Sequence, residues 1–274
     1  NELFVGENVC IQKNQSGIGG GGGVKSLGGY LSLKGAVIAE NQAKDGNHGG
    51  GVLTAGKTEI SDCRIFGNSA SRAGGGICFY DSSVGTSGRG IISGTKVYEN
   101  TAATNGAGIM IGSSKGTVTA EETEVYENQG TEGGIRCQKG SVFQMKGGAV
   151  WGNSRYGISN GGNMVLSGNL RIGRKTDLPD TRPSQKGKIQ AGGIYNTGEL
   201  SANAREVVLT WEGDESGCGL YNNGGRAVWN GSISGNFRYG ICNAGGGTVE
   251  IRDKGSVAFC RWGIYNKKGA KLLL

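Results

Sequence analysis

Short apolar words that end in asparagine recur along this chain. The segment 65–68 reads IFGN, while 97–100 and 125–128 both read VYEN. Runs of three to five residues with β-branched and aromatic members, bounded by Gly, Asn and Ser, are typical of strands. No stretch keeps the apolar spacing of an amphipathic helix over several turns. We therefore expect an all-β protein in which helix is at most a minor element.

A second recurring word is a glycine followed by Ile, Val or Leu. Successive copies are 21 to 36 residues apart, and each interval contains three short strand-like pieces, such as GIMI, GTVTA and TEVYEN between 108 and 128. Because internal repeats of this kind cover the whole chain, we expect one domain over residues 1–274. The ten copies are Gly23-Val24, Gly51-Val52, Gly76-Ile77, Gly108-Ile109, Gly134-Ile135, Gly157-Ile158, Gly193-Ile194, Gly219-Leu220, Gly240-Ile241 and Gly263-Ile264.

A unit of three short strands cannot bury its own apolar side chains. Stacked as successive coils, such units share one continuous interior, and each strand pairs with its equivalents above and below. The sequence therefore predicts a parallel β-helix, a solenoid of about ten coils with three short strands per coil. At about 4.8 Å per coil the rod would be roughly 45–50 Å long.

Two series of asparagines should then form files along the axis. One series closes the apolar words, and the other follows the glycine of the second word by three residues. Asn tolerates the left-handed backbone of a tight corner, and its amide can bond to the backbone and to the next Asn. We interpret both series as structural ladders, with ligand contact as the alternative. They are Asn41, Asn68, Asn100, Asn128 and Asn153, and then Asn160, Asn196, Asn222, Asn243 and Asn266.

This pairing of words resembles the passenger repeats of polymorphic outer-membrane adhesins, which carry many GGAI-like and FxxN words. The matching segments are 75–77 and 133–135 for the first word, and 65–68, 97–100 and 125–128 for the second, where Ile or Val replaces the leading Phe. The resemblance covers roughly residues 20 to 160 best. It implies a right-handed parallel β-helix repeat displayed on a bacterial surface, and these words encode a fold rather than a ligand.

Composition narrows the class of protein further. Glycine supplies 57 residues, about three times its usual share. Collagen is excluded because Gly is not every third residue. No run approaches 18 apolar residues, so no membrane span is predicted. The chain begins without Met or a signal peptide and ends in a predicted strand. We expect a fragment of a larger secreted or cell-surface bacterial protein.

The cysteines and the single His48 do not have the spacing of a metal site. No C-x-x-C word is present, and one His cannot build a His-rich centre. We interpret the seven cysteines, at positions 10, 63, 78, 137, 218, 242 and 260, as mostly small buried apolar residues rather than a disulfide framework. We therefore expect no metal and no cofactor.

Catalysis is the competing hypothesis, because the predicted fold is similar to that of pectate lyases and polygalacturonases. Such a carbohydrate-active enzyme would be a polysaccharide lyase or a glycoside hydrolase. Hydrolysis needs two carboxyl groups a short distance apart, yet the chain has no Asp-Asp pair and no Gly-His-Gly or Arg-Ile-Lys word. Arg182-Pro183 matches a lyase word only faintly. We name no catalytic residue and lean against an enzyme.

Acidic residues also precede several ladder asparagines. Glu99 and Glu127 should lie about one strand spacing apart on adjacent coils, and Glu40 joins them if the register persists. Stacked carboxylates repel one another unless water screens them or a cation bridges them. The sequence leaves open a solvated acidic stripe and a Ca²⁺ site.

Charge is uneven along the predicted rod. Residues 1–140 contain 12 basic and 13 acidic side chains, net −1, whereas residues 141–274 contain 17 and 9, net +8. In the basic half, Arg-aromatic pairs precede three of the Gly-Ile words, and tyrosines follow three of the apolar residues. Arg beside flat rings suits sugars that bear carboxylates or sulfates; a stabilising cation–aromatic ladder is the alternative. The candidate ligand-binding residues are Arg155, Tyr156, Tyr195, Tyr221, Arg238, Tyr239, Arg261, Trp262 and Tyr265.

These features together favour a non-catalytic adhesin or binding domain. Its partner would be a host or environmental glycan or protein, with acidic glycans as the favoured class. A structural stalk is the second alternative to this function. Nucleic acid is not expected, because the basic residues are not gathered in one dense run. Residues 173–188, which hold both prolines, predict a projecting surface loop.

Overall fold

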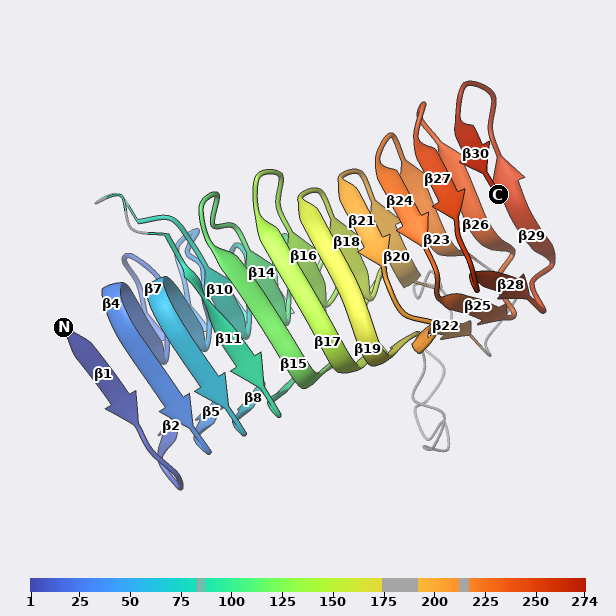
Figure 1. Cartoon of the computed structure of the whole chain (residues 1–274). Coiled ribbons are helices and arrows are strands. Elements are labelled where there is room, and N and C mark those ends of the chain that lie inside the picture. Colours follow the sequence, from blue (N-terminus) through green and yellow to red (C-terminus); the bar gives the residue numbers. More distant parts are fainter. Residues whose placement is uncertain (83–84, 86, 174–191, 212–216) are drawn as a thin grey trace.

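The computed structural model describes residues 1–82, 85, 87–173, 192–211 and 217–274. In these residues there is no helix, and the main sheet of 26 strands curls about 337° round a common axis (Figure 1). All strand pairs are parallel, from β1 with β4 to β27 with β30. This confirms the predicted all-β parallel β-helix. The described residues contain no helix with the length and apolar character needed to cross a bilayer.

Ten strands carry the Val, Ile or Leu of the Gly-Ile words, and we call these the anchor strands. The anchor strands are β4 (Val24–Lys34), β7 (Val52–Ser61), β10 (Ile77–Phe79), β14 (Ile109–Ile111), β16 (Ile135–Cys137), β18 (Ile158–Asn160), β20 (Gly192–Asn196), β23 (Cys218–Asn223), β26 (Tyr239–Ala244) and β29 (Trp262–Asn266). The long strands β4 and β7 continue into the second side of the coil.

The other sides of the coil are built from shorter segments, which merge into long strands in the middle of the rod. The second side contains β1 (Glu2–Val5), β11 (Arg89–Ser93), β15 (Thr117–Tyr126), β17 (Val142–Trp151), β19 (Asn163–Gly173), β21 (Glu199–Ala202), β24 (Arg226–Trp229), β27 (Thr248–Ile251) and β30 (Lys271–Leu273). The third contains β2 (Cys10–Gln12), β5 (Val37–Ala39), β8 (Arg64–Phe66), β12 (Lys96–Tyr98), β22 (Val207–Trp211), β25 (Ser232–Gly235) and β28 (Ser256–Ala258). Two-residue strands form a fourth side in the first coils: β3 (Gln15–Ser16), β6 (Gln42–Ala43), β9 (Ser69–Ala70) and β13 (Thr101–Ala102).

The apolar residues of the ten Gly-Ile words form one file along the axis. Each pairs in register with its counterpart in the next coil, from Val24 opposite Val52 to Ile241 opposite Ile264. In eight of the ten words a Cβ on the glycine would come within 3.0 Å of another atom; on Gly76 it would lie 2.6 Å from the carbonyl oxygen of Gly108. The predicted stacking of coils is therefore confirmed over all ten words.

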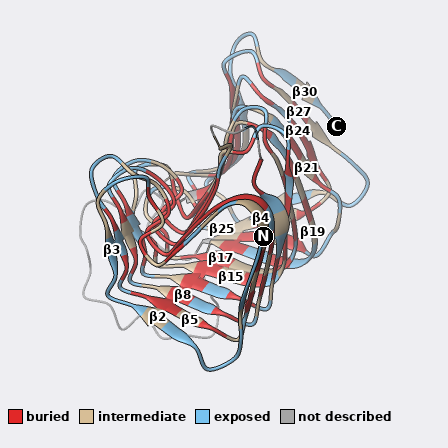
Figure 2. Cartoon of the chain, turned by 90° about the vertical axis from the view of Figure 1, so that its left-hand side faces the viewer, coloured by how far each residue is buried: buried red, intermediate tan, exposed pale blue. Residues whose placement is uncertain are grey.

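One apolar core runs through the coils. Figure 2 shows buried residues in every coil, and a small separate cluster of Leu53, Ala73, Cys78 and Met110 is also buried. Mostly Ile, Val and Leu fill the core, with Phe79, Phe143 and Trp229 as its largest fully buried members. Each such burial contributes roughly 1.5–3 kcal/mol. Because every coil covers its neighbours, this stabilisation exists only in the stack.

The first asparagine series forms a buried ladder at the corner before the two-residue strands. Each Nδ2 donates to the Oδ1 of the next asparagine at 2.9–3.0 Å, from Asn41 to Asn153. The same Oδ1 also accepts the backbone N–H of the preceding ladder residue. Asn14, which sequence reasoning missed, extends this ladder by donating to Asn41; the word Ile11–Asn14 was the available signal.

The second series forms another ladder at the end of the anchor strands. Each Nδ2 donates to the Oδ1 of the next asparagine in the series. From Asn160 through Asn196, Asn222 and Asn243 to Asn266, the four successive distances are 2.8, 2.7, 2.9 and 2.8 Å. The same file contains Phe79, Ile111 and Cys137 in the earlier coils. This file is polar at Ser26 and Thr54, apolar from Phe79 to Cys137, and polar again from Asn160 onward. The ladders change corner between Asn153 and Asn160.

Two details differ from the sequence prediction. The left-handed conformation belongs to the residue before each Asn of the first series, as at Glu40, Gly67 and Glu99 with φ of 55°, 63° and 53°. The chain turns at that residue, and none of the asparagines of this series has a positive φ. The first coils also add the fourth side formed by β3, β6, β9 and β13, so three strands per coil describes only the last coils.

An aromatic stack accompanies the first ladder on the outside of the coil. Phe66, Tyr98, Tyr126 and Trp151 lie in register, with ring centroids 4.9, 4.8 and 4.5 Å apart and interplanar angles of at most 11°. Sequence reasoning did not predict this stack, although the aromatic letter in the second position of each word was the signal. Because each inner ring is covered on both faces, the stack stabilises the coils.

Candidate functional site

The tyrosines predicted to bind a ligand lie in files beside the buried anchor residues of the last coils. Tyr195, Tyr221 and Tyr265 each follow an anchor residue and share one file, in which Cys242 takes the remaining position. Their side chains are half-buried or exposed, on the opposite face from Ile194 and its equivalents. The structure therefore brings these three tyrosines onto one side of the rod, which we call the tyrosine face.

The remaining aromatic candidates, Tyr156, Tyr239 and Trp262, lie two residues before an anchor, and the rings of the two tyrosines reach the next coil. Tyr156 stacks on Tyr195 at 5.1 Å and 21°, and Tyr239 stacks on Tyr265 at 5.0 Å and 20°. Tyr239 and Trp262 are in register, as predicted from the consecutive words. The ring contact of Tyr239 is nevertheless the diagonal one with Tyr265, because the side chains lean along the axis.

Cations cover rings on this face. The Arg155 guanidinium lies 5.6 Å from the Tyr156 centroid, Arg238 lies 5.5 Å from Tyr239, and Lys267 lies 5.8 Å from Tyr265. With rings stacked on rings and cations above them, little flat surface is left for a sugar to stack on. The tyrosine face instead offers ring edges, hydroxyls and charged groups to a ligand.

The exposure, hydrogen bonding and ionisation of individual side chains further define the tyrosine face. Arg261 and Trp262 are exposed in the last coil, and Trp262 has 57% of its surface accessible. The Tyr195 hydroxyl accepts a hydrogen bond from Asn223 at 3.0 Å. Burial raises the pKa of the Tyr156 phenol, so this group remains a neutral hydroxyl at physiological pH.

A polar groove runs next to the tyrosine face, where each anchor strand turns into the second side. We call this bend the glycine corner, and its hollow over coils β16 to β27 has a volume of about 580 Å³. The floor is glycine because the coils approach closely: a Cβ on Gly198 would lie 2.2 Å from the Gly162 oxygen, and one on Gly225 would lie 2.5 Å from the Gly198 oxygen. The missing side chains leave the groove. Its longer side chains are Arg136, Lys139, Glu199 and Arg226.

The charges in the groove differ in how firmly they are held. Arg136 pairs with Glu132 at 3.1 Å and donates to Ser159 at 2.7 Å. Arg226 pairs with Glu250 at 3.1 Å, and its separation from Glu199 is 4.0 Å. Lys139 makes no ion pair within the part of the chain that the structure describes.

Arg136 also belongs to the tyrosine face. It lies in register with Ser159, which in turn lies in register with Tyr195. The groove and the tyrosine face therefore form one continuous surface. Neither the groove nor the roles of Arg136, Lys139 and Arg226 were predicted from the sequence, although the glycine pairs after the ladder asparagines were a signal.

Glu132 and Glu250 form ion pairs with groove arginines but do not line the groove themselves. Among the described residues that line the groove, Glu199 is the single carboxylate, whereas glycoside hydrolysis uses two. No group of three or more His, Cys, Asp or Glu is placed to hold a metal ion in the described ranges. In the predicted acidic stripe, Glu99 and Glu127 occupy successive coils, but Gly67 separates Glu40 from them.

Cysteines lie beside the tyrosine face as free thiols. All seven are unbonded, and four of them are buried, in line with the interpretation as small apolar residues. Cys218 and Cys242 take the diagonal that Tyr239 and Tyr265 take one coil later. The interaction between the two thiols lowers the pKa of Cys242 to about 7 and raises the pKa of Cys218.

The inserted loop predicted at residues 173–188 falls, beyond Gly173, outside the described residues, as does Arg182-Pro183. No protein family matches this sequence, and no curated protein sequence matches it. Among solved structures, a variant of the catalytic domain of GH87 alpha-1,3-glucanase in complex with nigerose is similar over 98% of this chain, with 13% identity and a TM-score of 0.25. The alignment spans 63% of that chain.

Proposed function

We propose that this chain is a non-catalytic binding domain of a secreted or surface-displayed bacterial protein, an adhesin-type β-helix that recognises acidic glycans. The observation that carries this proposal is the continuity of the groove with the tyrosine face through Arg136. The surface runs parallel to the axis, and its cations come from several coils, so an extended polymer would meet the same kind of contact at each step.

Acidic sugars suit this surface better than neutral ones. Guanidinium and ammonium groups donate charge-assisted hydrogen bonds to carboxylate and sulfate oxygens. Arg155 and Arg238 are exposed and lie in the half of the chain with net charge +8, and Lys139, also exposed, lies just before that half begins. The tyrosine hydroxyls and the glycine floor supply neutral polar contacts for sugar hydroxyls. From the β16 coil to the β26 coil, four steps of about 4.8 Å give a surface roughly 19 Å long.

The other two functions make different demands on the same surface. A hydrolase of the predicted fold class would need a second carboxylate next to Glu199, and none of the described lining residues supplies one. A structural stalk would need no recognition surface at all. The groove and its uncompensated Lys139 support binding over both alternatives.

A glycan array followed by titration tests the proposal. The variant Lys139→Ala with Arg238→Ala removes two cations that make no ion pair in the described part of the chain. The control Lys34→Ala with Lys96→Ala removes the same charge from earlier coils, where both lysines are exposed, ion-paired and outside the groove. We expect the first variant to bind uronic acid or sulfated oligosaccharides about tenfold more weakly or worse, because each charge-assisted bond contributes ~1.5 kcal/mol or more.

The remaining outcomes decide between the functions. Binding of acidic glycans should weaken as salt rises, because exposed charges are screened. Equal affinity in both double variants would eliminate the groove as the site. Release of reducing ends or of unsaturated uronates from a polysaccharide panel would establish an enzyme instead. Absence of any glycan binding by the intact chain would leave the stalk.

A further inference from the structure

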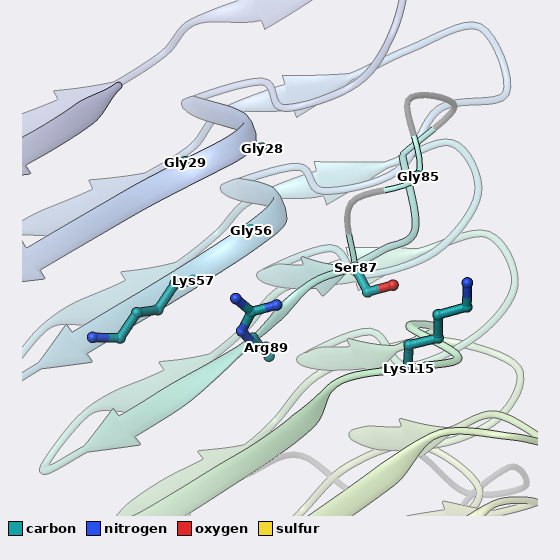
Figure 3. A pocket seen from close by; sticks show the side chains of 8 residues that line it. All are labelled: Gly28, Gly29, Gly56, Lys57, Gly85, Ser87, Arg89 and Lys115. Carbon is teal, nitrogen blue, oxygen red and sulfur yellow. The ribbon is translucent and has the colours of Figure 1, made fainter.

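The glycine corner continues into the first half of the rod, where it carries a second hollow. Tyr30, Lys57 and Arg89 lie in register on neighbouring strands, each just after the corner. Beside them lies a hollow of about 410 Å³, which Lys115 also lines. Figure 3 shows Arg89 between Lys57 on one side and Lys115 on the other, next to the bends of the glycine corner.

The floor of this hollow is bare backbone. Gly28 has φ of 71°, at the irregularity in β4 where the register shifts between Leu27 and Tyr30. A Cβ on Gly56 would lie 2.5 Å from the Gly29 oxygen, so no other residue fits in the present backbone. A ligand can therefore approach the main chain directly between the cationic side chains.

The positive charges around the hollow are unequally compensated. Like charges on directly opposed strand positions repel, and Lys57 and Arg89 are such a pair. Lys57 is neutralised by Glu59 at 3.1 Å and lies 4.9 Å from the Tyr30 centroid. Arg89 and Lys115 make no ion pair in the part of the chain that the structure describes. Two positive charges thus remain at the hollow.

The Asp81 carboxylate beside the hollow is occupied by neutral donors, and one of them is Ser87, which lines the hollow. The Asp81 carboxylate accepts hydrogen bonds from Ser113 at 3.0 Å and from Ser114, through its hydroxyl at 2.6 Å and its N–H at 2.9 Å. Asp81 does not line the hollow, and no described lining residue is a carboxylate. The site therefore lacks an anion of its own.

We propose that this hollow binds a phosphate monoester carried on a small polar group such as a sugar. A phosphate monoester is close to a dianion above about pH 6, which matches the two uncompensated charges of Arg89 and Lys115. A sulfate ester or a carboxylate carries one negative charge and leaves one cation unmatched. The Arg89 guanidinium presents a fork that suits two phosphate oxygens, and Lys115 adds a point charge. The volume of the hollow is within the range of small-ligand sites.

Titration followed by amide NMR of the whole chain tests this site with defined probes. Glucose 6-phosphate should shift the amides of Gly28, Gly29 and Gly56 at pH 7.5, with an affinity about fivefold or more above that of glucose 6-sulfate, because its charge is nearly doubled. At pH 5 the phosphate ester becomes a monoanion, and the two probes should bind alike. Glucuronate should resemble the sulfate ester at both pH values.

Single-residue variants then test whether Arg89 and Lys115 bind the phosphate. Arg89→Ala and Lys115→Ala should each weaken glucose 6-phosphate binding about fivefold or more, since each removes a charge-assisted contact. Lys96→Ala, an exposed and ion-paired lysine elsewhere, should change it less than about twofold. Lys115 lies in a bend outside the strands, so its variant keeps the test valid if Arg89→Ala disturbs folding.

Three results would overturn the proposal. They are shifts that occur away from the glycine corner, equal binding of phosphate and sulfate esters at pH 7.5, and unchanged affinity in the Lys115 variant. The site shares no residue with the groove of the last coils, so this proposal and the acidic-glycan function can fail separately.

Discussion

Replacing Asn100 with alanine should strongly destabilise the rod, because this residue is the middle of the first ladder. Its Oδ1 accepts from the Asn68 backbone N–H and from Asn68 Nδ2, both at 3.0 Å. Its Nδ2 donates to the Ile65 carbonyl and to Asn128 Oδ1, also at 3.0 Å. The side chain is fully buried, so water cannot replace these partners.

The expected loss in the free energy of unfolding depends on which hydrogen bonds the neighbours of Asn100 retain in the variant. Asn68 Nδ2 keeps the Ile38 and Phe66 carbonyls, and Asn128 Oδ1 keeps the Asn100 backbone N–H. The Asn68 backbone N–H loses Asn100 Oδ1 as its acceptor, which costs about 1–3 kcal/mol for a buried group. The other lost bonds contribute roughly 0.5–1.5 kcal/mol each. We expect a total loss of about 3–5 kcal/mol.

The matched control is Asn266→Ala at the exposed end of the second ladder. Asn266 accepts from Asn243 at 2.8 Å and donates to the Ala270 carbonyl at 3.0 Å, but it is open to solvent. Water can bond to the groups that this substitution frees, so the loss should stay below about 1 kcal/mol.

Urea unfolding followed by circular dichroism gives both free energies by linear extrapolation. Hydrogen exchange adds a local readout, since the Asn68 amide should lose protection in Asn100→Ala before the rest of the rod does. A loss for Asn100→Ala no larger than that for Asn266→Ala would refute the reasoning that burial makes the ladder a major source of stability.

Two further predictions concern thiol reactivity and the glycine word. The interaction with the Cys218 thiol lowers the pKa of Cys242 to about 7, whereas burial raises the pKa of Cys78 to about 12. In native protein at pH 8, iodoacetamide should therefore modify Cys242 much faster than Cys78, with the Cys242 rate falling as pH drops through 7, because the thiolate is the nucleophile; equal rates by mass spectrometry would contradict this. Gly76→Ala places a methyl 2.6 Å from a carbonyl oxygen, and Gly263→Ala meets nothing within 4 Å. Urea unfolding should show a loss of about 1–3 kcal/mol for the first and under about 0.5 kcal/mol for the second, and similar losses would exclude the steric explanation.

The asparagines show how far sequence reasoning reached. Their spacing was enough to place them in files, since residues that recur once per coil must align when coils stack. The backbone at the corner was predicted wrongly, because the left-handed residue is the one before Asn, as at Glu99. A single sequence shows which residue types recur, but not which residue of the word makes the turn.

The candidate site was less accessible from sequence. The predicted tyrosines do share a face, yet their rings stack diagonally on one another, as Tyr156 does on Tyr195. The groove beside them was not predicted, because a groove is made by glycines that lack side chains and by residues from five coils. Lys139 and Arg226 are 87 positions apart in the chain, and only the register of the coils places them on one surface.

The sequence by itself determined the periodicity of this protein, and with it the parallel stack, the buried file of Val, Ile and Leu and the two asparagine series. Those features depend on one residue meeting its own equivalent in the next coil, which spacing along the chain already encodes. Only the tertiary structure decided which side chains contact a residue of the next coil diagonally, and where glycines leave a hollow between the coils. The pairing of Cys218 with Cys242 and the charge left unmatched beside Arg89 arise from such offsets, because lateral distance in a solenoid is set by the bends of each coil and not by the repeat.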